Sequence, residues 1–500
     1  MVSVPRSISR GNAVNFTIAP DFAALKKAWL SNIRGDTLAG MTVALALIPE
    51  AIAFSIIAGV DPMVGLYASF CIAVVIAFAG GRPGMISAAT GSMALIMVVL
   101  VRDYGLEYLL AATVLTGIIQ LALGLLNVGR FITFIPYSVV LGFVNALAIL
   151  IFLAQLPFLI GAPPAVYALS AASVAIIVLL PRLTKAVPPA LVAIVAVTAA
   201  AVALHLDVLT VGGMGEITRT LPSFHLPVVP LTLDTLLIIL PYAVTLVIVG
   251  LIESLLTASI IDEMTGTQGD NDREVRGQGI ANCVAGLFGG MAGCAMIGQS
   301  VINVRSGGSG RLSTLVAGLF LIFLIIVLGD IVAMIPMAAL VGVMIMVAVG
   351  TFEWQSVRDL PRIPRGDAAV MLLTVAIVVA THDLAKGVIA GVVLAALIFG
   401  WKISVISAAK TLREDGAMVY TMKGQLFFGT MSAFMDLFDY AGDPVRVRID
   451  FSHSHIWDQS GVEAITRVVH RYQQHGKSVY VTGLNEESQA TLDRGFSREK

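Results

Sequence analysis

The chain has 500 residues, of which 57% are hydrophobic and 13% are charged, and its formal net charge at pH 7 is −1. Soluble domains carry roughly 25% charged residues, so this composition is typical of a membrane protein, and the small net charge offers no bulk attraction to nucleic acid. The three cysteines lie in apolar stretches without the spacing of a disulfide framework or a metal site. We expect Cys71, Cys283 and Cys294 to be small core residues.

Residues 1–35 are predicted to form a cytoplasmic N-terminal segment, because their start is mixed polar and lacks the apolar core of a cleaved signal peptide. Apolar runs of the length that crosses about 30 Å of hydrocarbon then repeat through residues 36–410, the predicted transmembrane domain. In the first half the predicted spans cover 37–57, 62–79, 85–101, 107–127, 131–153, 165–181 and 188–206. In the second half they cover 235–262, 275–290, 297–306, 312–329, 331–351, 367–381 and 384–406.

The distribution of Lys and Arg agrees with seven plus seven spans. If the N-terminus is inside, only three Lys or Arg residues of the transmembrane domain fall on the outer side: Arg102, Arg219 and Lys386. This agrees with the rule that short cytoplasmic loops carry the excess of positive charge. An odd number of spans in the first half would invert the second half relative to the first. The sequence therefore predicts an all-α polytopic membrane protein with 14 spans in an inverted repeat.

A glycine-rich interruption occurs at a matching place in each half, in Gly80–Met93 and in Gly289–Ile302. Each would let an apolar helix begin inside the bilayer, with its unpaired N–H groups and positive dipole end available to an anion. Small or hydrogen-bonding residues stand at these starts: Ser87 and Thr90 in the first copy, and Gly298, Gln299 and Ser300 in the second. The alternative is that the glycines serve only close helix packing.

Two carboxylates lie in the middle of predicted spans. Glu50 follows Pro49 in the first span, and Glu253 lies in the eighth. An ionised side chain at such depth costs at least several kcal/mol unless it faces a polar cavity or takes up a proton, so both are functional candidates. The alternative is a neutral carboxyl group that is merely hydrogen-bonded between helices. Pro49 favours a functional role for Glu50, because it bends the helix and frees a backbone carbonyl.

Residues 411–500 are predicted to form a small soluble α/β domain, because charges become frequent and strand patterns alternate with a helical one. The predicted strands are Ala417–Phe428, Val445–Phe451 and Val479–Thr482. The predicted helix is Gln459–His475, with its apolar residues on one face.

Several segments resemble a known family. Asp36–Phe54 and Ala58–Ser69 are similar to the first-span signature of the SulP sulfate-permease family of anion transporters. Gly250–Ser254, Glu274–Asn282 and Gly286–Gly290 resemble its eighth and ninth spans, so the resemblance covers nearly the whole chain.

The family carries a C-terminal STAS domain, and two segments of this chain resemble that domain. Gly424–Gly429 is similar to its strand, and Asp458–Gly461 to its strand-to-helix turn. In regulatory relatives of STAS a serine at this turn is phosphorylated, which makes Ser460 a candidate phosphosite, although its simplest interpretation is a helix cap. His453 and His455 lack a third ligand, so we predict surface polar residues and no metal site.

The resemblance also implies a core domain and a gate domain, an elevator-like movement of the core, and a homodimer. It places the substrate between the third and tenth half-helices and implies that the eighth-span carboxylate, Glu253, couples a proton or another ion to transport. The substrate-contacting residues that it implies are Glu50, Phe54, Ser87, Ala88, Ala89, Thr90, Met296, Ile297, Gly298, Gln299 and Ser300.

The predicted site has more acid and less base than is usual in the family. Many members have Gln at the position of Glu50, and some have a basic residue near Gln299. An ionised Glu50 would repel an anion, whereas its protonation removes the repulsion, so anion and proton would enter together. We therefore predict a proton-coupled symporter.

The identity of the anion stays open at this point. The family carries sulfate, bicarbonate, chloride, oxalate or dicarboxylates, and the leading hypothesis is a dicarboxylate such as fumarate or succinate. The alternatives are Na⁺-coupled bicarbonate transport, with Glu253 and backbone carbonyls binding Na⁺, or sulfate or chloride transport. A hypothesis of another class is an anion sensor that signals through STAS.

The sequence predicts no enzyme and no cofactor. It shows no phosphate loop, nucleophile elbow or zinc motif. The predicted location is the bacterial cytoplasmic membrane, with the N-terminus and the STAS domain in the cytoplasm. The predicted partners are a small anion, a co-transported proton or Na⁺, the lipid bilayer and a second copy of the chain.

Overall fold

The computed structural model describes residues 28–127, 129, 136–183 and 188–496. Most of the predicted N-terminal segment, 1–27, and the start of the predicted span 131–153 lie outside the described residues. The chain divides into two compact units, Met1–Ile363 with Met371–Ile389, and Pro364–Val370 with Ala390–Lys500.

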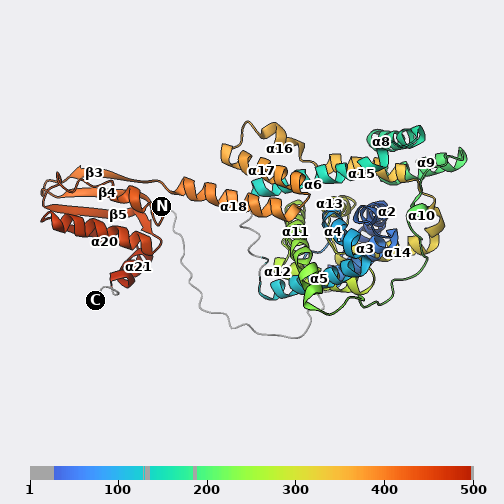
Figure 1. The fold of residues 1–500 in the computed structure, drawn as a ribbon, viewed down its shortest axis with the longest axis horizontal. Coiled ribbons are helices and arrows are strands. Elements are labelled where there is room, and N and C mark those ends of the chain that lie inside the picture. The colour runs from blue at the N-terminus through green and yellow to red at the C-terminus, as the bar shows by residue number, and fades with distance from the viewer. Residues whose placement is uncertain (1–27, 128, 130–135, 184–187, 497–500) are drawn as a thin grey trace. The chain divides into compact units, whose positions relative to one another are not determined.

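The membrane part repeats one order of elements in its two halves. In Figure 1 the helices of the first half run from blue to green and those of the second half from green to orange. The first half contains α2 (Ile33–Ala58), α3 (Pro62–Ala79), β1 (Ser87–Ala89), α4 (Gly91–Tyr104), α5 (Leu106–Leu125), α6 (Tyr137–Leu153), α7 (Leu156–Leu159), α8 (Pro164–Leu183), α9 (Pro189–Ala203) and α10 (Val211–Met214). The second half contains α11 (Leu233–Thr265), α12 (Asn271–Leu287), β2 (Gly293–Ala295), α13 (Ile297–Arg305), α14 (Arg311–Ala333), α15 (Met337–Thr351), α16 (Trp354–Asp359), α17 (Arg365–Thr381) and α18 (Leu384–Ile403).

Each predicted span corresponds to one helix of this series, so seven lie in each half as predicted. Among the described residues, eight helices are long and apolar enough to cross a membrane. The other spans are the half-helices α4 and α13, the short apolar helices α9 and α15, and α12 and α17, which carry charges in their first turns. Two span starts were predicted several residues too early. The third span was expected from residue 85, but its helix begins at Gly91, because Ser87–Ala89 is extended. The twelfth was expected from residue 331, but α14 continues to Ala333 and α15 begins at Met337.

The two short strands cross at the centre of the first unit. β1 and β2 pair antiparallel, with Ala88 opposite Cys294 and Ala89 opposite Gly293. Gly293 permits this contact, because a Cβ there would lie 2.1 Å from the Ala88 carbonyl oxygen. Since equivalent strands of the two halves run in opposite directions, the repeat is inverted, as predicted.

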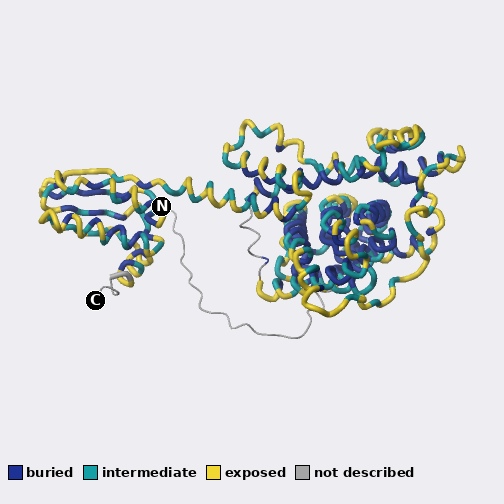
Figure 2. Tube along the Cα trace, viewed as in Figure 1, coloured by how far each residue is buried: buried dark blue, intermediate teal, exposed yellow. Residues whose placement is uncertain are grey.

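The helices around the crossing form two groups. The first group consists of the two strands and the helices α2, α3, α4, α5, α11, α12, α13 and α14, which pack on one another, whereas α6, α8, α9 and α15 pack together. Glycines allow close approach in the first group: a Cβ on Gly279 of α12 would lie 2.5 Å from the Leu121 nitrogen of α5. Figure 2 shows the buried residues concentrated along the interior helices and exposed ones along α8, as expected for a face that meets lipid.

The C-terminal domain is a four-stranded sheet with helices, in the order β3-β4-β5-β6. Its elements are β3 (Ile406–Leu412), β4 (Met418–Leu426), α19 (Met431–Met435), β5 (Arg446–Ile456), α20 (Gln459–Gln474), β6 (Ser478–Thr482) and α21 (Glu486–Phe496). β3 pairs antiparallel with β4, and the other pairs are parallel. The predicted α/β domain is confirmed, although β3, which starts before residue 411, was not predicted.

The N-terminus of α20 corrects the interpretation of Ser460. The N-cap is Asp458, whose Oδ1 accepts a hydrogen bond of 2.9 Å from the Gly461 nitrogen. Its Oδ2 accepts a second bond of 2.9 Å from the Phe428 nitrogen, which ties the cap to the end of β4. Ser460 is the second helical residue and is not the cap, because the carboxylate two residues earlier occupies that role.

Candidate functional site

Two helices begin in the protein interior, directly after the crossing strands. The N-cap of α4 is Thr90 and that of α13 is Met296, both buried and in extended backbone, and neither side chain caps its helix. The N–H groups of each first turn therefore lack an intrahelical acceptor and present a positive dipole end to the centre. This is the arrangement predicted for an anion site.

The first turn of α13 faces open space, whereas that of α4 is covered. Gly298 is exposed, and a Cβ there would meet nothing within 4 Å. A Cβ on Gly91 would lie 2.8 Å from the Phe54 ring and 3.2 Å from Ile151. Of the two dipole ends, the one at α13 is thus the more accessible to a ligand.

One face of α2 serves both half-helices. Glu50 and Phe54 are four residues apart and share that face. Phe54 packs over the start of α4 at Gly91, and the half-buried Glu50 has the Gln299 side chain, in the first turn of α13, as its hydrogen-bonding partner. The structure thus brings three predicted residues, Glu50, Phe54 and Gln299, to the strand crossing.

Other predicted residues build the frame of the crossing. Ser87 Oγ accepts a hydrogen bond of 2.8 Å from Gln278 Nε2, and Ser300 Oγ accepts one of 2.9 Å from the Ile86 nitrogen. Ala88 and Ala89 lie in β1 and are buried, as is Met296. Ile297 is half-buried beside Gly298.

Glu253 of α11 lies in a buried cluster that joins both strand-helix units. Its Oε2 accepts hydrogen bonds from Ser92 Oγ at 2.5 Å and from Cys294 Sγ at 3.1 Å. Thr90 Oγ1 lies 3.1 Å from Ser92 Oγ and 3.2 Å from Cys294 Sγ. Ser92 was not predicted from the sequence, and the prediction that Cys294 is a plain core residue was incomplete, because its thiol donates a hydrogen bond to Glu253.

A polar stripe on α12 was also missed. Glu274, Gln278 and Asn282 follow one another at intervals of four residues, which places them on one helix face. Glu274 Oε2 accepts a bond of 2.7 Å from the Gly81 nitrogen, and Asn282 bonds both the nitrogen and the oxygen of Gly293, at 2.9 and 3.1 Å. The spacing of these polar residues in a predicted span was the signal that could have revealed them.

The described residues hold no group of three or more His, Cys, Asp or Glu side chains that could bind a metal ion. His455 Nδ1 instead lies 2.6 Å from Asn485 Nδ2, and its Nε2 lies 3.7 Å from a Glu487 carboxylate oxygen.

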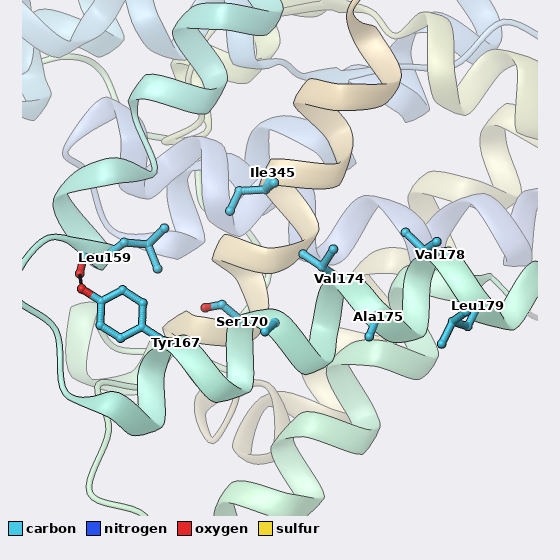
Figure 3. Close-up of a pocket in the computed structure, with 9 residues that line it drawn as sticks. Leu159, Tyr167, Ser170, Val174, Ala175, Val178, Leu179 and Ile345 are labelled. Carbon is cyan, nitrogen blue, oxygen red and sulfur yellow. Dashed lines mark hydrogen bonds between the residues drawn. The ribbon is translucent and has the colours of Figure 1, made fainter.

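An apolar groove of about 540 Å³ lies elsewhere, along α8 and α15. Figure 3 shows Tyr167, Ser170 and Val174 of α8 lining it, with Ile345 of α15 opposite. None of the predicted site residues lines this groove.

Inverted half-helices that begin at a strand crossing inside a polytopic bundle define the class of protein as a membrane transporter. The family described as "Sulfate permease family" matches residues 33–177 and 164–374, and the STAS domain family matches residues 408–497. The chain belongs to the sulfate permease family, as the sequence resemblance implied. It is accordingly a multi-span membrane anion transporter and not an enzyme.

Three similar proteins illustrate the match. "Putative sulfate transporter YbaR" of Bacillus subtilis (strain 168) is 57% identical over 468 residues, which are 94% of this chain and 98% of that protein. The transmembrane domain of a cyanobacterium bicarbonate transporter, BicA, is 29% identical with a TM-score of 0.66 and covers 72% of this chain and 97% of its own. Murine Slc26a9, an anion transporter solved in the inward-facing state, superposes with a TM-score of 0.84 over 100% of this chain and 96% of its own; at 18% identity it shows the fold alone.

Proposed function

We propose that the chain is a secondary active symporter that couples the entry of a dicarboxylate, such as fumarate or succinate, to a proton. The observation that carries the proposal is the carboxyl group of Glu50, which has Gln299 as its partner beside the open first turn of α13. Among the described residues, no basic side chain interacts electrostatically with the Glu50 carboxyl group. The positive counterpart for the anion is therefore the helix dipole.

Charge explains why such a site would need a proton. Two unit charges of equal sign about 4 Å apart repel by about 4 kcal/mol at an effective dielectric constant of about 20. An ionised Glu50 would thus oppose the anion that the start of α13 attracts. Once protonated, the same group donates a hydrogen bond to a carboxylate, while the free N–H groups of the first turn bind its other oxygen.

The movement that we propose is elevator-like. The two strands and the helices α2, α3, α4, α5, α11, α12, α13 and α14 form one packed group, so they would carry the site as one body past α6, α8, α9 and α15. The close glycine contacts between α5 and α12 support a rigid moving body. We also propose the homodimer that the family resemblance implies.

A dicarboxylate fits this chemistry because a neutral Glu50 is a hydrogen-bond donor to a carboxylate, and because proton-using members of the family include dicarboxylate carriers. Na⁺-coupled bicarbonate transport is the second candidate, favoured by the similarity to BicA. In that case Na⁺ would bind at Glu253, whose Oε2 already accepts bonds from Ser92 and Cys294. Sulfate transport is the third candidate, favoured by the similarity to YbaR.

The test is uptake of labelled fumarate into proteoliposomes with and without an inward proton gradient. We expect the gradient to stimulate uptake, and the Glu50→Gln variant to lose that stimulation. Glu107→Gln is the matched control, because Glu107 is bonded to His225 and lies outside the cluster. Uptake that requires Na⁺ and ignores pH would replace the proposal with the bicarbonate candidate, and no uptake of any tested anion would favour the sensor.

A further inference from the structure

The cluster at Glu253 is a closed ring of four hydrogen-bonding atoms. Its edges are Glu253 Oε2 to Ser92 Oγ at 2.5 Å, Ser92 Oγ to Thr90 Oγ1 at 3.1 Å, Thr90 Oγ1 to Cys294 Sγ at 3.2 Å, and Cys294 Sγ back to Glu253 Oε2 at 3.1 Å. The four side chains are at most 8% exposed. They come from α11, the start of α4 and β2, so the ring joins both half-helix units to one carboxylate.

Counting hydrogens shows that the ring closes in only one protonation state. With Glu253 ionised, Ser92 and Cys294 both donate to Oε2, and the single hydrogen of Thr90 serves one of its two neighbours. Three hydrogens then fill three of the four edges, and two lone-pair atoms face each other across the fourth.

With Glu253 protonated, the fourth edge is filled. The carboxyl hydrogen is donated to Ser92, the Ser92 hydrogen to Thr90, the Thr90 hydrogen to Cys294, and the thiol hydrogen to Glu253. Each atom then donates once and accepts once, and such chains of hydrogen bonds reinforce one another. Only hydroxyl and thiol hydrogens rotate between the two arrangements, and the heavy atoms keep their places.

We propose that Thr90, Ser92 and Cys294 are positioning residues that allow Glu253 to accept and release one proton at fixed geometry during transport. The inference rests on the proposed proton coupling. The family resemblance already implies a coupling role for Glu253, and the inference adds the three side chains that position its proton. In the step, a hydronium ion of the aqueous medium loses one O–H bond as its proton forms one O–H bond on the Glu253 carboxylate. On the opposite side of the membrane this O–H bond breaks, and the proton returns to a water molecule.

Other charged groups on the elements packed against α11 are engaged elsewhere or lie near the ends of their helices. The Glu274 carboxylate of α12 accepts hydrogen bonds from the Gly81 and Arg82 nitrogens, and the Glu107 carboxylate of α5 is bonded to His225.

The remaining charged groups lie toward helix ends. Arg102 of α4 pairs with Asp103, and Arg305 lies in the last turn of α13. On α11 itself Asp262 pairs with Arg82, two and a half turns from Glu253. The contacting titratable group is therefore Cys294.

Thr90→Val is the most discriminating variant, because Thr90 does not touch Glu253. Valine has the same shape as threonine but lacks the hydroxyl group that accepts the Ser92 hydrogen bond in the closed ring. Both donors to the ionised Glu253 carboxylate, Ser92 and Cys294, remain. When one hydrogen bond is lost from only one of the two protonation states, the pH at which the group is half protonated changes by about one unit. We expect the midpoint of the pH profile of uptake to move by about that amount toward acid.

Cys294 provides a second pair of variants. Cys294→Ser retains one hydrogen and one acceptor and should keep the wild-type pH profile, whereas Cys294→Ala opens the ring and should displace the midpoint at unchanged KM. Cys71→Ala is the control, since Cys71 lies in α3, outside the ring. Variants are compared only after size-exclusion chromatography shows equal amounts of folded transporter.

The outcomes separate this inference from the proposed function. A wild-type pH profile in Thr90→Val, Cys294→Ala and Glu253→Gln, together with a flat profile in Glu50→Gln, would overturn the ring and leave the proton symport standing. Uptake by the wild-type protein that does not respond to pH would overturn the proposed function itself.

Discussion

Two glycines of the second glycine-rich segment meet opposite requirements. Gly293 lies in β2, where a Cβ would approach the Ala88 carbonyl oxygen to 2.1 Å, so the strand crossing excludes any side chain. Gly298 lies in the first turn of α13, where a Cβ would meet nothing within 4 Å. The first glycine is required for packing, whereas the second has open space beside it.

Alanine at these two positions should therefore have different effects. Gly293→Ala should destabilise the protein by about 3 kcal/mol through overpacking, measured as loss of the monodisperse peak in size-exclusion chromatography. Gly298→Ala should fold normally, but its methyl group enters the open space at the first turn of α13 and should raise KM for succinate roughly tenfold relative to bicarbonate. Equal KM changes for both anions would show that Gly298 does not limit substrate size.

At the level of elements, the C-terminal domain is stabilised by a cap and by a buried polar cluster. Asp458 accepts bonds from Gly461 at the start of α20 and from Phe428 at the end of β4, so one carboxylate orders a helix and a strand end. Loss of the cap in Asp458→Ala should cost about 1 to 2 kcal/mol. Ser460→Ala should change stability by less than about 0.5 kcal/mol, because its hydroxyl does not cap the helix.

Urea unfolding of the STAS domain, followed by pulse proteolysis of the full-length protein, measures both variants. If Ser460→Ala were the more destabilising of the two, the assignment of the cap to Asp458 would be wrong.

The buried cluster predicts an alkaline limit for the same domain. The hydroxyl groups of Tyr420 in β4 and Tyr472 in α20 both donate to Asp443, which is 7% exposed. Burial, and then the hydrogen bond to Asp443, raise the pKa of Tyr420 and that of Tyr472 above the ordinary value of about 10. Because these pKa values are raised in the folded state, the stabilisation is fully present below pH of about 10 and is lost as the pH rises further.

Tyr472→Phe should cost about 1 to 3 kcal/mol at neutral pH, because Asp443 loses a buried donor, and should weaken the alkaline loss of stability. Tyr480, which is 57% exposed, gives the control variant Tyr480→Phe. The urea midpoint at neutral and at alkaline pH is the measurement, and an alkaline loss of equal size in Tyr472→Phe and wild type would contradict the prediction.

At the level of the whole molecule, the site and the STAS domain belong to different units of the chain. The predicted site residues Glu50 and Glu253 and both half-helices all lie in the first unit. This separation supports a regulatory or stabilising part for STAS.

A chain that ends at Ile403 should therefore keep the KM and pH profile of uptake and lose folded amount or maximal rate. Uptake in proteoliposomes with matched protein content tests this, with the full-length protein as reference. A changed pH profile in the shortened chain would show that the STAS domain takes part in coupling.

Light scattering of the full-length protein should give a protein mass of two copies of the 52.6 kDa chain.

The sequence by itself determined the number and approximate positions of the spans, the inverted repeat, the two half-helices and the two carboxylates within spans. These features are local, because a bilayer demands about 20 apolar residues per span and penalises every charge or helix break within it. The sequence did not reveal that Ser87 and Ser300 stabilise the strand crossing through hydrogen bonds, or that Gly298 faces open space. It also did not reveal that Ser92 and Cys294 donate hydrogen bonds to Glu253. Ser92 and Glu253 are 161 residues apart, and such contacts depend on how helices pack around the crossing, which only the tertiary structure decides.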